Sequence, residues 1–283
     1  MRLYPGVLNA LILAALTVTG SSQSGPKGSL FIIGGGDRPM AMMEKMLKTA
    51  DLGPGKNILV LTMASANPDT SYHYIKKDLQ VLCANPVLKM QLTRVSARQP
   101  AVLDSIRCAG LLYITGGVQS RFMDSIAGTG VAEAIHAAYR SGAMIAGTSA
   151  GAAVMSRVMI TGNQIRGDTL YEGAVDRMAE GNIETSTGLG LLEQVIIDQH
   201  FIVRSRYNRL FTLLHQYPAK VVIGIDESTA ILVHGRRAEV TGEGQVVVAR
   251  RPVKIRTGPG RKIGFRSARL DVCLEGDRFK IKP

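Results

Sequence analysis

The sequence predicts an α/β protein with a doubly wound, mostly parallel sheet, helices on both faces, and a small antiparallel β appendage at the C-terminus. From about residue 29 to 226, short apolar runs alternate with helical patterns, and this alternation is typical of βαβ units. The runs are apolar throughout, as in strands that are buried on both faces. From residue 229 onward, short β-like pieces separated by glycine-rich turns replace the helical patterns.

The expected elements follow from the apolar periodicity. The strand-like runs cover residues 29–33, 57–62, 110–115, 142–146, 191–197 and 220–225. The helical patterns between them include residues 40–50, 71–82 and 131–139. Ligands bind at the carboxyl ends of the strands in an open α/β sheet, so functional side chains are expected directly after these runs.

Residues 1–23 are predicted to be a signal peptide. Arg2 gives a basic start, an apolar run extends from Leu8 to Val18, and small polar residues follow. About a dozen apolar residues are few for spanning a bilayer, so we expect no stable membrane anchor. The mature chain is then expected to be secreted or periplasmic, with an α/β domain over residues 24–235 and a basic β-rich segment, 236–283, packed on it.

The positive charge is concentrated in that last segment. The chain has a net charge of +12, and residues 236–283 contain 13 Lys or Arg against 5 Asp or Glu. No aromatic residues are interleaved for stacking and no nucleic-acid module is present, so nucleic acid is not an expected partner. The segment is interpreted as a solvated face, with attraction to an anionic polymer or cell surface as the alternative.

The sequence gives no sign of a metal or cofactor. Cys83, Cys108 and Cys273 are too few for a disulfide framework, and CxxC, CxxH and HExxH spacings are absent. The triglycine Gly34–Gly36 lacks the further glycine of a dinucleotide fingerprint, because Pro39 occupies that position. We interpret the triglycine as a segment that turns tightly or passes close to the site.

Ser149 is the candidate nucleophile. The pentapeptide from Gly147 to Gly151 fits the Gly-x-Ser-x-Gly nucleophile elbow, which lies between a strand and a helix. The elbow holds the nucleophile in strained backbone geometry, so its neighbours must be small. The backbone N–H of Ala150 would then help to stabilise an oxyanion.

A serine nucleophile requires a histidine base and an orienting carboxylate. His200 is the one of the five histidines that follows a strand-like run directly. Asp226 and Glu227 follow the next run, and either carboxylate could orient His200. The order serine, histidine, acid differs from the serine, acid, histidine order of the α/β-hydrolases, which disfavours lipases and esterases.

The chain resembles the cyanophycinases and related serine peptidases, which share their fold with class I glutamine amidotransferases. Four ordered segments carry the resemblance: residues 113–119 (YITGGVQ), 147–152 (GTSAGA), 198–201 (DQHF) with three arginines after it, and 224–230 (GIDESTA). It implies that Ser149 is the nucleophile, His200 the base and Glu227 the orienting acid. It also implies that the N–H of Gly117 is a second oxyanion donor. Residues 24–235 are then the peptidase domain.

The resemblance implies hydrolysis of cyanophycin, a β-linked aspartyl-arginine polymer, to β-aspartyl-arginine dipeptides. Each repeat carries a carboxylate and a guanidinium, and the predicted substrate-binding residues suit these groups: Gln119, Asp198, Gln199, Arg204, Arg206 and Arg209. An exported dipeptidase acting on short aspartyl peptides is the alternative, and a non-catalytic binding protein is a third hypothesis. The expected partners are cyanophycin or short β-aspartyl peptides and a second copy of the chain in a homodimer.

Overall fold

The computed structural model describes residues 25–166 and 175–283. The predicted signal peptide lies outside the described residues, so that export remains a prediction. Within the described ranges no helix is both long enough and apolar enough to cross a bilayer.

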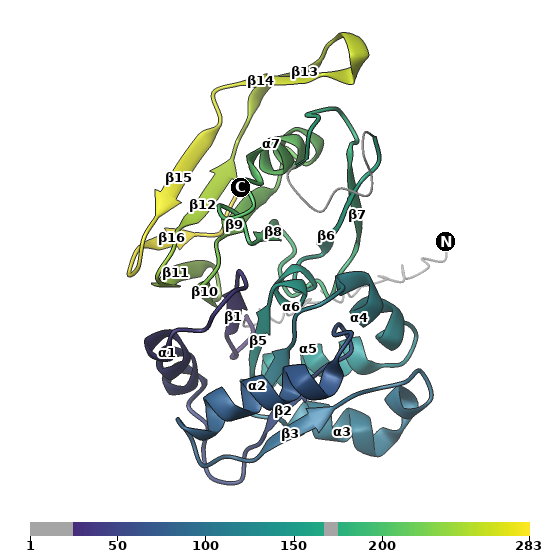
Figure 1. Ribbon diagram of the computed structural model, residues 1–283, viewed down its shortest axis with the longest axis vertical. Helices are drawn as coiled ribbons and strands as arrows, with labels where there is room; N and C mark the ends of the chain where they lie inside the picture. The colour runs from purple at the N-terminus through teal and green to yellow at the C-terminus, as the bar shows by residue number, and fades with distance from the viewer. Residues whose placement is uncertain (1–24, 167–174) are drawn as a thin grey trace, which may run out of the picture.

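An eight-stranded sheet forms the centre of the fold (Figure 1), in the order β16-β11-β10-β1-β5-β4-β2-β3. Its parallel part contains β1 (Leu30–Ile33), β2 (Ile58–Leu61), β3 (Val87–Met90), β4 (Leu111–Ile114) and β5 (Met144–Thr148). Three antiparallel strands extend it beyond β1: β10 (Thr229–His234), β11 (Arg237–Gly242) and β16 (Arg278–Lys280). Of the β-rich part predicted from residue 229 onward as an appendage, these three strands therefore continue the main sheet.

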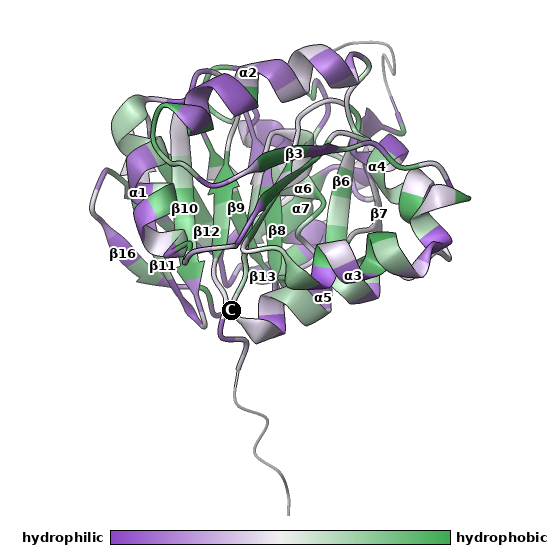
Figure 2. Cartoon of the chain, turned by 90° about the horizontal axis from the view of Figure 1, so that it is seen from below, coloured by the Kyte–Doolittle hydropathy of each residue, from purple (hydrophilic) through white to green (hydrophobic). Residues whose placement is uncertain are grey.

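Helices cover both faces of this sheet because its strands are apolar on both sides. Leu30 and Ile32 belong to one core cluster, whereas Phe31 and Ile33 belong to another, as the alternation of side chains along a strand requires. One face is covered by α1 (Met40–Ala50) and α2 (Pro68–Gln80), and the other by α3 (Pro100–Cys108), α4 (Gln119–Ile126), α5 (Val131–Ser141) and α6 (Ala150–Ala153). Figure 2 shows hydrophobic strands enclosed by helices that carry hydrophilic residues.

A second, four-stranded sheet has the order β15-β12-β9-β8. It contains the parallel pair β8 (Val195–Gln199) and β9 (Val221–Ile225), with the antiparallel strands β12 (Val246–Arg250) and β15 (Arg269–Cys273). Helix α7 (Tyr207–Gln216) packs on this sheet through Leu210, Leu213 and Leu214. Two antiparallel pairs of strands form separate small sheets: β6 (Val158–Gln164) with β7 (Ile183–Thr187), and β13 (Val253–Thr257) with β14 (Ile263–Arg266).

The two sheets meet where β9 leads into β10. The residues Asp226–Ser228 connect the end of β9 in the smaller sheet to the start of β10 in the larger one. The backbone N–H of Ser228 donates to the carbonyl of Gly35, and that of His200, after β8, donates to the carbonyl of Gly34, each at 2.9 Å. These bonds bring the carboxyl ends of β1, β8 and β9 together.

Candidate active site

Ser149 lies on a sharp bend between β5 and α6. Its backbone has φ 52° and ψ −110°, a strained conformation for a residue with a side chain. Space around the bend is minimal: a Cβ on Gly147 would lie 2.5 Å from the Gly151 carbonyl oxygen, and one on Gly151 would lie 2.2 Å from that of Ile114. The small residues of the predicted elbow are therefore required by close backbone packing.

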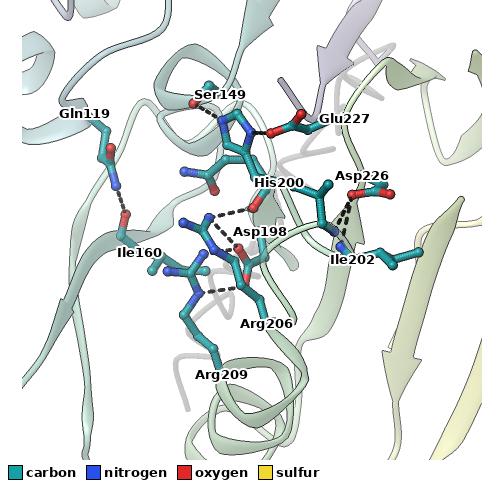
Figure 3. A network of polar contacts seen from close by, with 12 residues as sticks. Gln119, Ser149, Ile160, Asp198, His200, Ile202, Arg206, Arg209, Asp226 and Glu227 are labelled. Atoms are coloured by element: carbon teal, nitrogen blue, oxygen red, sulfur yellow. Dashed lines mark hydrogen bonds and ion pairs between the residues drawn. The ribbon is translucent and has the colours of Figure 1, made fainter. Parts of the chain in front are cut away.

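The side chains of Ser149, His200 and Glu227 form a continuous hydrogen-bonded chain (Figure 3). Ser149 Oγ lies 2.8 Å from His200 Nε2, and His200 Nδ1 lies 2.5 Å from Glu227 Oε1. A carboxylate can only accept, so Nδ1 carries the proton and donates it, which leaves Nε2 as the acceptor for the serine hydroxyl. This is the tautomer that a general base requires.

Asp226 makes different contacts from Glu227. Its Oδ1 accepts hydrogen bonds from the backbone N–H groups of Ile202 and Val203, both at 3.0 Å. The Asp226 carboxylate therefore fixes the turn after His200, whereas that of Glu227 contacts the imidazole directly.

The triglycine passes directly beside these side chains, as its sequence predicted. A Cβ on Gly35 would lie 2.2 Å from His200 Cε1, and one on Gly36 would lie 2.7 Å from Glu227 Cβ. Both glycines also have positive φ, 125° and 68°. The backbone of the loop after β1 thus forms a wall against which the imidazole and the carboxylate rest.

Replacing Gly35 with alanine is expected to lower kcat/KM by about 100-fold, because the added methyl group displaces the imidazole by roughly an ångström. Gly55→Ala is the matched control, since Gly55 also has positive φ but has open space around its Cβ position. For each variant, kcat/KM of the folded protein and the free energy of unfolding would both be measured, so that a loss of activity is separated from a loss of stability. Equal losses of activity in the two variants would contradict the steric argument.

The surroundings of His200 lower its pKa below the ordinary value of 6.5. Burial is the largest cause, and the charges of Arg204 and Arg206 act in the same direction, whereas Glu227 opposes them. The imidazole is therefore neutral at neutral pH and able to accept a proton.

Arg204→Gln is expected to move the acidic limb of the kcat/KM profile to higher pH. The positive charge of Arg204 disfavours imidazolium, so its removal raises the pKa of His200 and the base becomes protonated at higher pH. Arg236→Gln provides a control, because Arg236 is exposed in the turn at the far end of β10. An acidic limb that shifts no further for Arg204→Gln than for the control would disprove this coupling.

The two predicted oxyanion donors lie on segments next to Ser149. Ala150 is the first residue of α6, where backbone N–H groups have no acceptor within the helix. Gly117 follows Gly116, on which an added Cβ would lie 3.4 Å from Ser149 Cβ. Gly117 itself has φ 133°, and an added Cβ there would lie 2.2 Å from the Ala64 carbonyl oxygen. This placement agrees with an oxyanion hole, and the role of the two N–H groups remains a prediction.

Asp198, Arg206 and Arg209 form a buried ion-pair cluster (Figure 3). Arg209 donates through Nε and Nη2 to the two oxygens of Asp198, which has no exposed surface, and Arg206 Nη1 donates to the Gln199 carbonyl at 2.6 Å. These groups were predicted to bind substrate. That role remains a prediction: in the structure Asp198 lies in the buried strand β8, next to its last residue, and the two guanidinium groups pair with it inside the protein.

The remaining predicted binding residues have separate environments. Gln119 is buried, and its Nε2 donates to the carbonyls of Ile160 and Thr161 at 2.9 and 2.7 Å, which ties α4 to β6. Gln199 is also buried, and its side-chain Oε1 has no hydrogen-bond partner among the described residues. Arg204 is exposed. Only Arg204 of the three arginines is therefore accessible from solvent.

A cleft of about 250 Å³ opens beside Ser149 and His200. It is also lined by Arg38, Tyr113 and Thr148, which the sequence analysis did not select. Arg38 follows the triglycine at the carboxyl end of β1, and Thr148 is the last residue of β5. The expectation that functional side chains lie at the carboxyl ends of strands could therefore have identified both residues. Across the described part of the chain, no group of three or more His, Cys, Asp or Glu side chains is placed to hold a metal ion.

Comparison with known proteins connects this geometry to a family. The model of peptidase family S51 matches residues 30–241 of the chain. A cyanophycinase of Trichormus variabilis is 33% identical over 206 residues, which cover 68% of this chain and 65% of that protein. A cyanophycinase of Nostoc sp. is 36% identical over 182 residues, covering 62% and 57%. The chain thus spans less than two thirds of these two relatives. A cyanophycinase of Geminocystis herdmanii is 28% identical over 273 residues, covering 90% and 94%.

Solved structures share the fold. A peptidase from an acI-B1 Actinobacterium superimposes with a TM-score of 0.65 at 21% identity, covering 89% of this chain and 96% of that one. A putative peptidase E protein from Listeria monocytogenes gives a TM-score of 0.54 at 17% identity, covering 77% and 99%. The predicted fold class, the resemblance to cyanophycinases and the serine-peptidase class are confirmed by these comparisons.

Proposed function

The chain belongs to peptidase family S51, and on that premise we propose that it hydrolyses cyanophycin to β-aspartyl-arginine dipeptides through Ser149, His200 and Glu227. The observation that carries this proposal is the hydrogen-bonded chain from the serine hydroxyl through the imidazole to the carboxylate. The name of the relatives, cyanophycinase, supplies the substrate.

The first half of the proposed reaction forms an acyl-enzyme. Ser149 Oγ attacks the carbonyl carbon of the scissile amide while its proton passes to His200 Nε2. The N–H groups of Gly117 and Ala150 stabilise the negative charge on the carbonyl oxygen. The imidazolium then gives its proton to the leaving nitrogen, the C–N bond breaks, and the acyl group remains as an ester on Ser149.

The second half releases the product with water in place of the amine. His200 Nε2 takes a proton from the water, the hydroxide attacks the ester carbonyl, and Ser149 leaves with the proton returned from the imidazolium. Glu227 holds the imidazole in the reactive tautomer and stabilises its positive charge in both halves. The residues named here need no cofactor for either step.

The site of action and the assembly are further parts of the proposal. The N-terminal pattern of a basic residue, an apolar run and small polar residues supports export, with cyanophycin or its fragments met outside the cytoplasm. The homodimer expected from the sequence remains a prediction, and the molecular mass of the purified protein in solution would test it.

A digest separates this function from the alternative of a dipeptidase. Purified protein would be incubated with cyanophycin and, separately, with short aspartyl peptides, and the products identified by mass. The proposal expects β-aspartyl-arginine dipeptides from the polymer. Intact polymer together with cleaved short peptides would instead establish the exported dipeptidase.

A further inference from the structure

Two residues that line the cleft beside Ser149 have buried hydroxyl groups that make no hydrogen bond to the rest of the described protein. Tyr113, on β4, is 1% exposed, and Thr148, at the end of β5, is 9% exposed. Neither hydroxyl forms a hydrogen bond of ordinary geometry with a described residue, and the contact that the two make is with each other. Both residues line the cleft with Ser149 and His200. Buried polar groups are normally satisfied, so two unsatisfied hydroxyls beside a candidate nucleophile indicate a place for a ligand group.

The packing of Tyr113 strengthens this interpretation. Its ring belongs to the apolar core between the sheet and helices α1 and α2, where a phenylalanine would fill the same volume. Burial raises the pKa of Tyr113 to about 12, against the opposing effects of the Arg38 charge and the Thr148 hydroxyl. The phenol therefore keeps its proton at neutral pH and is available as a hydrogen-bond donor.

Arg38 gives the same cleft a positive charge. Its Nε and Nη2 both contact a single oxygen of Asp78, Oδ2, at 2.8 Å. A guanidinium has five N–H donors, and the described residues provide no partner for Arg38 Nη1. The cleft thus combines a cation that is only partly used with two hydroxyl donors, a set that matches a carboxylate.

We propose that Arg38, Tyr113 and Thr148 form a specificity pocket for a free carboxylate of the substrate unit that adjoins Ser149. The inference rests on the proposed function, in which each repeat of the polymer carries one carboxylate and one guanidinium. A guanidinium has no acceptor for the two hydroxyl protons and is repelled by Arg38. Such a pocket would bind the carboxylate at a different place from Arg206 and Arg209, whose guanidinium groups pair with the buried Asp198.

The test uses two substrates and a matched pair of tyrosine variants. One substrate is a β-aspartyl-arginine oligomer with free carboxylates, and the other is the same oligomer with those groups converted to carboxamides. Tyr113→Phe removes the buried hydroxyl and keeps the ring. Tyr74→Phe is the control, because Tyr74 lines the same cleft but is 60% exposed at its rim.

Tyr113→Phe is expected to raise KM for the carboxylate oligomer by about 10- to 100-fold, as for a lost hydrogen bond to a charged group, with kcat nearly unchanged. The ratio of kcat/KM for the carboxylate oligomer to that for the carboxamide oligomer should fall by a similar factor in Tyr113→Phe. Arg38→Gln should lower the same ratio. Stability without substrate should change little for Tyr113→Phe, since the described contact that its hydroxyl loses is the one with the Thr148 hydroxyl. Tyr74→Phe should match the wild type.

Two results would overturn the inference. One is an unchanged preference for carboxylate over carboxamide in both Tyr113→Phe and Arg38→Gln, and the other is tighter binding of the oligomer by Arg38→Gln, which would mean that the cleft takes the guanidinium. A wild-type protein that cleaves neither oligomer would refute the proposed function instead. Calorimetric binding of a short aspartyl peptide and of its amide then decides the pocket separately, since equal affinities would overturn it.

Discussion

Ser149→Ala is expected to lower kcat on cyanophycin by on the order of 10⁵- to 10⁶-fold, the loss typical of a removed serine nucleophile. The variant has no Oγ to form the acyl-enzyme, and the remaining imidazole can only activate water poorly. Alanine keeps the Cβ of serine, so the strained backbone at φ 52° is no more costly than in the wild type. The free energy of unfolding should change by no more than about 1 kcal/mol, the worth of the lost bond to His200.

A double-mutant comparison provides the control for this result. His200→Ala should reduce kcat about as severely, and the double variant should be little worse than either single one, because the two groups act as a unit. Initial rates with mass-identified products would be measured for all three. Near-normal turnover by Ser149→Ala, or full additivity of the two losses, would remove the basis for a serine mechanism.

Glu227→Gln is expected to reduce kcat by about 10⁴-fold with little change in KM. A glutamine amide can donate to Nδ1, which places the imidazole proton on Nε2 and removes the acceptor that Ser149 needs. It also removes the negative charge that stabilises imidazolium. The kinetic constants on the β-aspartyl-arginine oligomer would check this expectation.

Asp226→Asn is the matched control for the neighbouring carboxylate. Asparagine retains an oxygen that can accept from the N–H groups of Ile202 and Val203, so the turn after His200 should persist and kcat should fall by less than about tenfold. A larger loss for Asp226→Asn than for Glu227→Gln would transfer the role of the orienting acid to Asp226.

Much of the fold could be predicted because its inner strands are continuous apolar runs. The runs predicted at 57–62 and 110–115 are the strands 58–61 and 111–114. Strand β3 gives no such signal, because it lies at the edge of the sheet and exposes Leu88 and Lys89. Its residues therefore lack the apolar pattern of a buried strand.

The site could be predicted where a residue type that serine hydrolysis requires lies just after a strand, as for Ser149, His200 and Glu227. It was not predictable for Arg206 and Arg209. Three arginines close together give the same pattern whether they face solvent or a buried carboxylate, and only the burial of Asp198 distinguishes the two cases. Tyr113 was missed because, within an apolar run, its sequence context is the same as that of an ordinary core residue. Only the structure shows that it lines the cleft.

The position of β1 between β5 and β10 has a consequence for synthesis on the ribosome. Leu30 pairs with Val233 and Ile33 with Ala230, so β1 cannot pair with β10 until about 200 further residues have been synthesised. At usual translation rates this interval is about 10 to 40 s. A nascent chain that ends before β10 leaves one edge of β1 unpaired, a state prone to association with other chains. The candidate active site is therefore among the last parts of the molecule to assemble, since Glu227 emerges only just before β10.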